Sequence, residues 1–446
     1  MIKKYTLECR LDKHNNLELI QYFDSFIGYY NKVTRVVWHI MQSKTYKENF
    51  KKKSHFVTYI CKKYNLLKRV VNSIVKDVEG NIKKLRELKK YEIKQLKLKI
   101  KALIEYRKEQ SAKLETLKKR VVNNDLRVLE QYRNLKIKVY YLSQKINKKN
   151  LQFSNLERVI NNNEKIRLCY GSKIEFKKQY YLQLNKLKSH QSWKNNFLKN
   201  RDKVIHYVGS GDESYGNQLF NLIPDGLGYK IKVRKHIPNI EYKYINGYCH
   251  LKNYITNTNI IGEMQNFNRP LTYRIIRRKN KWYLQVVVEV EVNIVTRNNE
   301  GVIGLDYNEG FIELSETDKA GNLINNKRII IKDNVKEKLS GILKHALNVG
   351  KDIAIEDLNF NGTKGKMIKA KSKRGKIYNR MLSRLGYGMY KEGLINSGAR
   401  NGIGILLINP INSSKNGAIL YNEKKKLTTH QSASYVIARR GMGLKD

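Results

Sequence analysis

One stretch of the chain, residues 70–160, contains no proline and a single glycine, Gly80. Its apolar residues recur at multiples close to 3.5, with lysine, arginine and glutamate between them. This is the period of helices that pack through a coiled-coil seam. With its best break at residues 123–125, the pattern predicts an antiparallel helical hairpin over about residues 76–150. The predicted seam comprises Ile82, Leu85, Ile93, Leu96, Ile100, Leu103, Leu126, Leu129, Leu135, Val139, Leu142 and Ile146.

The chain as a whole, the hairpin included, is strongly basic. It holds 89 lysine and arginine residues against 39 aspartate and glutamate residues, a formal net charge of +50. Such a charge repels itself unless a polyanion neutralises it, so nucleic acid is the expected partner. An AT-rich genome would favour lysine over arginine, but it does not account for the deficit of acidic residues. The basic face of the hairpin is therefore either a solvated surface or a groove for RNA.

Composition also excludes several classes of protein. The four cysteines, at positions 9, 61, 169 and 249, form no C-x-x-C pair, so we expect neither a cysteine zinc site nor a disulfide framework, and we expect a reducing compartment. The N-terminus lacks an apolar segment of the signal-peptide kind, and no run of 18 apolar residues is present. We therefore expect no membrane partner.

Alternating β patterns flank the helical block. They cover residues 2–11, 229–234, 271–276 and 282–290. Strands on both sides of a helical block predict a β-barrel made of residues 1–12 and 206–297, with a helical domain inserted over residues 13–205. The last two strands are joined by a basic loop, in which we predict nucleic-acid contacts from Arg277, Arg278 and Lys279.

After residue 298 the pattern is that of an α/β domain, which makes the whole chain a multidomain α+β protein. We predict two strands, a helix, a strand, a loop, a helix, a strand and a last helix. The first strand carries Asp306 in an apolar run, and the segment DIAIE ends in Glu356. If these two strands are parallel neighbours, their acids meet at the same end of the sheet.

Two carboxylates at such close range need cations to offset their repulsion. Two bridged divalent metals would activate water and stabilise the leaving oxygen in phosphodiester hydrolysis. Oxygen ligands suit Mg²⁺, and Mn²⁺ is the alternative. A third ligand is expected from the last helix, residues 429–440, but its first turn holds no acid, and His430 occupies the expected place.

These motifs resemble the TnpB family, the RNA-guided nucleases of small bacterial insertion sequences, which are similar to miniature type V CRISPR effectors. The resemblance covers residues 165–446, whereas the first 160 residues share only the architecture. It is carried by the segments IGLDYN, IAIEDLNF, INPINSS, HQSASYVIARRGMGLKD, CYGSKIEFKKQ, YVGSGDESYGNQ and LTYRIIRRKNKWYLQVVVEV.

The resemblance implies an RNA-guided DNA endonuclease that works with a guide noncoding RNA on a double-stranded DNA target. It implies that the barrel is the wedge-like domain, that residues 13–205 form the recognition domain and that residues 298–446 form an RNase H-like, RuvC-like nuclease domain. Asp306 and Glu356 take the first and second metal-ligand roles, at a two-metal Mg²⁺ or Mn²⁺ site without zinc. The protein would be bacterial, cytoplasmic and associated with the nucleoid.

His430 is where the chain departs from the family, most of whose members have an aspartate there. Three interpretations of His430 are open. It is a metal ligand, or it has no catalytic role and Asp357 or Asp446 supplies the third ligand, or its presence indicates an inactive site. In the last case the protein is a nuclease-inactive, RNA-guided DNA-binding regulator. A protein-only, transposon-associated DNA nuclease or strand-transfer protein is a further alternative.

Basic residues near the two acids are predicted to contact nucleic acid. The segment between residues 363 and 376 holds seven basic residues and no acid, and it is either a solvated loop or a phosphate-binding one. Two arginines of the last helix either contact the backbone or cap that helix. The predicted contacts are Lys364, Lys366, Lys369, Lys371, Lys373, Arg374, Lys376, Arg439 and Arg440.

Overall fold

The computed structural model describes residues 2–162, 164–237, 243–251, 260–331, 334–358 and 387–445. The chain divides into two compact units, one made of residues 2–93 and 154–290 and the other of residues 94–153 and 291–446. Within these described ranges, no helix has both the length and the hydrophobicity that crossing a bilayer requires. The four cysteines are free.

Two sheets form in the unit of residues 2–93 and 154–290. The first has the strand order β1-β7-β6-β2 and the second the order β3-β4-β5. That these strands close into one barrel remains a prediction. The bounds are β1 (Ile2–Leu11), β2 (Val204–Tyr207), β3 (Phe220–Asp225), β4 (Gly228–Arg234), β5 (Tyr244–Cys249), β6 (Thr272–Arg278) and β7 (Lys281–Glu291).

The predicted hairpin of β6 and β7 is confirmed. Its two-residue turn consists of Lys279 and Asn280, whose φ angles are 47° and 60°. Two positive φ angles define the turn whose twist matches that of paired strands. The turn therefore holds Lys279 at an exposed tip.

The first helix of the same unit packs against β2 and β5. In α1 (Leu17–Met41) the side chains of Phe23, Phe26, Ile27 and Tyr30 are all buried, as their spacing predicts. The other helices of this unit are α2 (Tyr46–Asn49), α3 (Lys53–Tyr64), α6 (Lys173–Lys177), α7 (His190–Arg201) and α8 (Ile260–Asn266).

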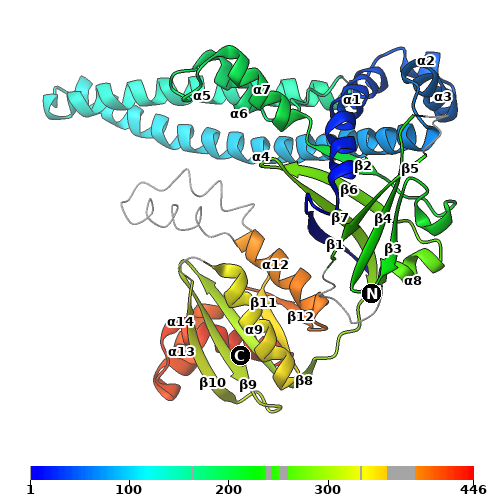
Figure 1. The fold of residues 1–446 in the computed structure, drawn as a ribbon. Helices are drawn as coiled ribbons and strands as arrows, with labels where there is room; N and C mark the ends of the chain where they lie inside the picture. The colour runs from blue at the N-terminus through cyan, green and yellow to red at the C-terminus, as the bar shows by residue number, and fades with distance from the viewer. Residues whose placement is uncertain are drawn as a thin grey trace. The chain divides into compact units, whose positions relative to one another are not determined.

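The predicted helical hairpin is present and longer than expected (Figure 1). It consists of α4 (Lys68–Val122) and α5 (Leu129–Asn161), and the chain reverses between them at Asn124, whose φ is 62°. Leu103 and Ile146 are buried in the seam. The seam assignment of Leu126 is wrong, because it lies in the 3₁₀ turn Leu126–Val128, where its side chain is exposed.

The last part of the chain forms a five-stranded sheet of order β10-β9-β8-β11-β12. β8, β11 and β12 are parallel, and β9 and β10 are antiparallel to their neighbours. We did not predict β10, because this edge strand is mostly exposed and its apolar residues stand at its two ends, around four polar ones, without an apolar alternation. The strands are β8 (Arg297–Asn308), β9 (Phe311–Thr317), β10 (Leu323–Ile330), β11 (Lys351–Glu356) and β12 (Ile405–Ile408).

Helices cover both faces of this sheet (Figure 1). α9 (Val335–Val349) and α12 (Tyr387–Arg400) pack on the face to which Ile303 and Leu305 point, and this face holds the larger core. α14 (Thr429–Gly441) packs on the opposite face, against Val302, with α13 (Ser413–Lys425) beside it. Successive strand residues point to opposite faces, so β8 presents Val302, Gly304 and Asp306 toward α14.

Candidate active site

Asp306 and Glu356 lie on two neighbouring parallel strands. The register places Ile355 of β11 beside Leu305 of β8, and each acid is the next residue along its strand. The prediction that these strands are parallel neighbours with acids at the same end is thus confirmed. Parallel strands, unlike antiparallel ones, direct equivalent positions to the same end of a sheet.

Asp306 is held by two neighbouring side chains. Its Oδ2 accepts a hydrogen bond from Asn308 Nδ2 at 2.9 Å and lies 3.1 Å from His430 Nδ1. The Asp306 side chain is only 12% exposed, whereas that of His430 is 47% exposed. The acid is therefore fixed, and its imidazole partner remains open to solvent.

α14 places His430 over the strand. The helix begins with a capping box, in which the Thr428 side chain accepts from the Gln431 backbone and the Gln431 side chain accepts from the Thr428 backbone. The helix backbone lies directly on Gly304, where a Cβ would collide with the carbonyl oxygen of Ser434. Glycine thus permits the close approach that brings the first helical turn to Asp306.

Glu356 sits in a more enclosed position. The pKa of its carboxyl is raised, mainly by burial and also by the negative charge of Asp306. Two groups act in the opposite direction and lower this pKa: the Ser413 hydroxyl, which donates a hydrogen bond to the carboxylate, and the positive charge of Arg440. Arg440 Nη1 donates to the carbonyl oxygens of Asn409 and Ile411, both at 2.9 Å. This arginine therefore fixes the loop before Ser413 and adds a positive charge beside the acids.

Neighbouring charges also shift the pKa of His430. The pKa of His430 is raised, mainly by its hydrogen bond to Asp306 and also by the charges of the Asp306 and Glu313 carboxylates. Burial and the positive charge of Arg328 act in the opposite direction. A protonated imidazole neutralises Asp306 but cannot coordinate a metal. His430 thus competes with a cation for the acid.

The donor set suits a hard divalent cation, since it consists of carboxylate oxygens and one imidazole nitrogen. Asp306, Glu356 and His430 are the residues that would hold it. Among the described residues, no three histidine, cysteine, aspartate or glutamate side chains lie close enough together to hold a metal ion. Each acid is instead turned to a protein partner, Asp306 to Asn308 and His430, and Glu356 to Ser413.

Our sequence reasoning missed Glu313. It lies directly opposite Asp306 in the antiparallel pair of β8 and β9, on the same face of the sheet, and its side chain is fully buried. The signal was present in the segment FIELSET, where the polar residues Glu313, Ser315 and Thr317 alternate with the apolar Ile312 and Leu314. Such alternation in a buried strand indicates a polar face.

The structure places Asp357 away from the candidate site. Its carboxylate pairs with Lys391 of α12, on the face opposite Asp306, so its side chain does not join the other two acids. Asp446, the other alternative to His430, lies outside the described residues, as do the predicted phosphate contacts Lys364, Lys366, Lys369, Lys371, Lys373, Arg374 and Lys376.

Of the remaining predicted nucleic-acid contacts, the four arginines have partners among the described residues, and Lys279 is exposed. Arg439 donates to the Gly321 carbonyl oxygen at 3.0 Å. Arg277 lies 3.3 Å from Asp24 and over the ring of Trp282. Arg278 lies 2.8 Å from Glu8 and over the ring of Tyr283. Binding nucleic acid through these arginines remains a prediction.

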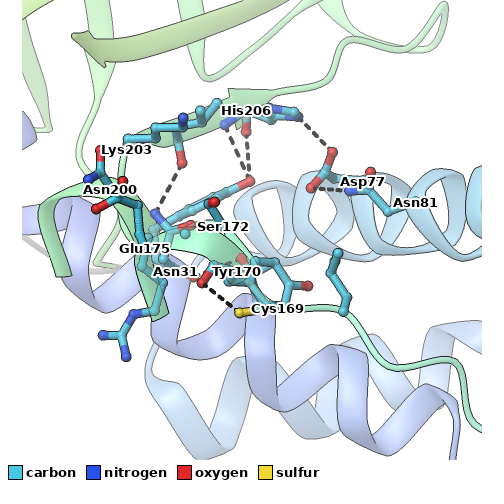
Figure 2. A pocket seen from close by; sticks show the side chains of 16 residues that line it. Asn31, Asp77, Asn81, Cys169, Tyr170, Ser172, Glu175, Asn200, Lys203 and His206 are labelled. Atoms are coloured by element: carbon cyan, nitrogen blue, oxygen red, sulfur yellow. Dashed lines mark hydrogen bonds and ion pairs between the residues drawn. The ribbon is translucent and has the colours of Figure 1, made fainter. Parts of the chain in front are cut away.

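A separate cavity of about 570 Å³ lies in the unit of residues 2–93 and 154–290 (Figure 2). The turn 168–172, from one of the motifs that carry the resemblance, lines it, and the buried hydroxyl of Tyr170 has no hydrogen-bond partner within the described chain. Asp77 lies 2.8 Å from His206 Nδ1 and accepts from Asn81 at 3.2 Å. None of the acids of the candidate active site belongs to this cavity.

No protein-family model matches the chain, and no curated protein matches it. Among solved structures it is similar to T. thermophilus RuvC in complex with a Holliday junction substrate, with 13% identity, a TM-score of 0.21 and coverage of 31% of this chain and 89% of that one. It is also similar to the Cas12f1–sgRNA–target DNA complex, with 12% identity, a TM-score of 0.32 and coverage of 98% and 99%.

Proposed function

We propose that this chain is an RNA-guided DNA endonuclease of the TnpB type that hydrolyses phosphodiester bonds with a divalent metal. One observation carries the proposal: Asp306 and Glu356 occupy the same end of two adjacent parallel strands, with His430 against Asp306. Asp306 and Glu356 are both partly buried, and neighbouring carboxylates need a cation to offset their repulsion, which supports a metal site.

Mg²⁺ or Mn²⁺ held at this site would supply an activated water and stabilise the leaving oxygen. Asp306 and Glu356 provide the carboxylates, and the neutral His430 ring provides a nitrogen. Asn308 and Ser413 orient the two acids, as hydrogen-bond partners of metal ligands generally do. Arg440 keeps the Ser413 loop in place and offsets the negative charge of the site.

The net charge of +50 supports the proposed partners. A guide RNA and a DNA target both neutralise a basic chain, and pairing between them would read the target sequence. In this proposal residues 1–12 and 206–297 act as the wedge-like domain, residues 13–205 recognise the nucleic acids, and residues 298–446 cut. The lysines and arginines between residues 364 and 376 bind phosphates near the cut.

A second candidate is a nuclease-inactive, RNA-guided DNA-binding protein. The observation that favours it is the contact between His430 and Asp306, because a protonated imidazole there takes the place of a cation. The two candidates share every nucleic-acid contact and differ only in whether the acids bind metal.

The test is to purify the chain from cells that carry the DNA flanking its gene and to sequence any bound RNA. The complex is then incubated with a plasmid that matches that RNA, in Mg²⁺ and in Mn²⁺. Cleavage that needs the RNA and is lost in the Asp306→Ala variant supports the endonuclease. Bound RNA with target binding but no cleavage supports the inactive regulator, and cleavage without RNA rejects RNA guidance.

A further inference from the structure

A row of charged side chains crosses three neighbouring strands of the sheet. Strand pairing sets Arg328 of β10 opposite Glu313 of β9, and Glu313 opposite Asp306 of β8. Directly opposed residues of antiparallel strands point to the same face, with their Cβ atoms in contact range. Glu356 of the next strand extends the row, so three carboxylates occupy adjacent strands on the face covered by α14.

Glu313 is the most deeply buried of these acids and is only half satisfied. Its side chain has no solvent exposure, Oε1 accepts from Arg328 Nε at 2.5 Å, and Oε2 has no hydrogen-bond partner within the described residues. A buried carboxylate with an unpaired oxygen is strongly unfavourable unless a cation completes its surroundings.

Arg328 by itself does not meet that need. Its side chain is 47% exposed and lies over the Phe311 ring, 4.4 Å from the ring centre to the guanidinium carbon. The same ring meets the His430 ring edge-on at 5.4 Å between centres. Glu313 thus lies between a partly solvated arginine on one side and the Asp306–His430 pair on the other, and the charge of Glu313 helps to raise the pKa of His430.

We propose that Glu313 is an additional ligand of the divalent metal, the acid that the first turn of α14 does not supply. The inference rests on the proposed function, because it takes Asp306 and Glu356 as the centre of the metal site. Arg328 acts as the counter-ion of Glu313 in the metal-free protein, and the metal takes its place. The carboxylate that completes the site therefore comes from β9, the neighbour of β8 on the side away from β11.

The experiment measures Mn²⁺ affinity of the full chain from the electron paramagnetic resonance signal of free Mn²⁺, without nucleic acid or cleavage. Four variants are compared with the unaltered chain: Asp306→Asn, Glu313→Gln, Glu313→Asp and Arg328→Gln. Thermal melting of each variant identifies loss of fold. Arg328→Gln breaks the same ion pair as Glu313→Gln, so it is the matched control for structural damage.

We expect Glu313→Gln and Glu313→Asp each to weaken Mn²⁺ binding about tenfold or more, and Arg328→Gln to preserve or strengthen it. Glu313→Asp is decisive, because it keeps the charge and shortens the reach. Full affinity in Glu313→Asp would mean that Glu313 acts only through its charge, and full affinity in Glu313→Gln would mean that it serves only Arg328. Either result overturns the inference. The proposed metal site still stands in that case if Asp306→Asn abolishes Mn²⁺ binding. If Asp306→Asn binds like the unaltered chain, or if the unaltered chain binds no Mn²⁺, both the inference and the proposed metal site fail.

Discussion

The helical hairpin and the five-stranded sheet carry charge in opposite ways. On the hairpin the charges lie in solvent, as in the pair Lys90–Glu87, whose side chains are 54% and 61% exposed. In the sheet the acids of the candidate site are enclosed, with Asp306 12% exposed and Glu313 fully buried. Exposed charges are screened and act through their sum, whereas buried charges act one by one through their geometry. Single substitutions should therefore matter greatly in the sheet and little in the hairpin.

The largest effect is expected from the two acids. Asp306→Ala and Glu356→Ala should lower DNA cleavage by more than about 100-fold, because each removes a metal ligand, and should leave RNA and DNA binding unchanged. Cleavage rates and gel-shift affinities check this. The matched control is Asp357→Asn, next to Glu356 in sequence but paired with Lys391 on the other face, which should cut normally. Wild-type cleavage by either alanine variant would refute the site.

The next effect concerns His430. If it binds metal, His430→Ala should lose most cleavage, while His430→Asp should keep or raise it and shift the preference from Mn²⁺ toward Mg²⁺. Cleavage by the wild-type, alanine and aspartate forms in both metals checks this. Full activity of the alanine variant would exclude a ligand role. Cleavage by the aspartate variant alone would indicate an inactive natural site.

The pH dependence of the wild type sharpens the same point. Asp306 raises the pKa of His430 above its ordinary value of 6.5. Protons therefore begin to compete with the metal for the imidazole at a pH above that ordinary value. Cleavage should fall as pH decreases through this range. The effect of pH on the stability of the metal-free protein has the opposite sign. The ion pair between protonated His430 and Asp306 stabilises the folded state fully below the pKa of His430 in the unfolded chain, and this stabilisation is lost as pH rises through the raised pKa of the folded state. Cleavage rates and metal-free melting temperatures across pH 5.5–8.5, a range of about three units around the ordinary histidine pKa, check both trends.

A smaller effect is expected from the glycine under α14. Gly304→Ala should destabilise the protein by about 1–3 kcal/mol, because a methyl group collides with the helix backbone, and should lower cleavage by displacing His430. Urea titration and cleavage assays measure the two effects. Gly341→Ala in α9 is the control, since nothing lies near its Cβ position, and it should stabilise slightly. Equal stability of the two variants would contradict the close packing of α14 on β8.

The smallest effects are expected on the hairpin. RNA binding should weaken steeply with salt, and bound RNA should raise the melting temperature. If the basic face binds RNA, replacing an exposed lysine such as Lys101 or Lys118 by glutamine should reduce the slope of log affinity against log salt by about 0.7 each. Arginine at the same positions should preserve the slope. An unchanged slope in the glutamine variants would mark the face as merely solvated.

The sequence predicted the elements with strong periodicity. The hairpin, the buried face of α1, the β6–β7 turn and the acid-bearing strands all follow from regular apolar spacing or from turn residues. It did not predict β10, whose polar edge residues carry no such signal. It also misplaced Leu126, because a periodic pattern does not reveal which leucine falls at the reversal of the chain.

What the sequence determined by itself is the inventory: a basic chain, a long hairpin, and two apolar strands that each carry an acid. What only the tertiary structure decided is which charged groups meet. Strand register set Glu313 beside Asp306, and the packing of α14 on Gly304 set His430 on the same carboxylate. These contacts join residues that are 7 and 124 positions apart in the chain. The first pairing follows from the register of the β8–β9 hairpin, whereas the second depends on how α14 packs on the sheet, which local spacing does not encode.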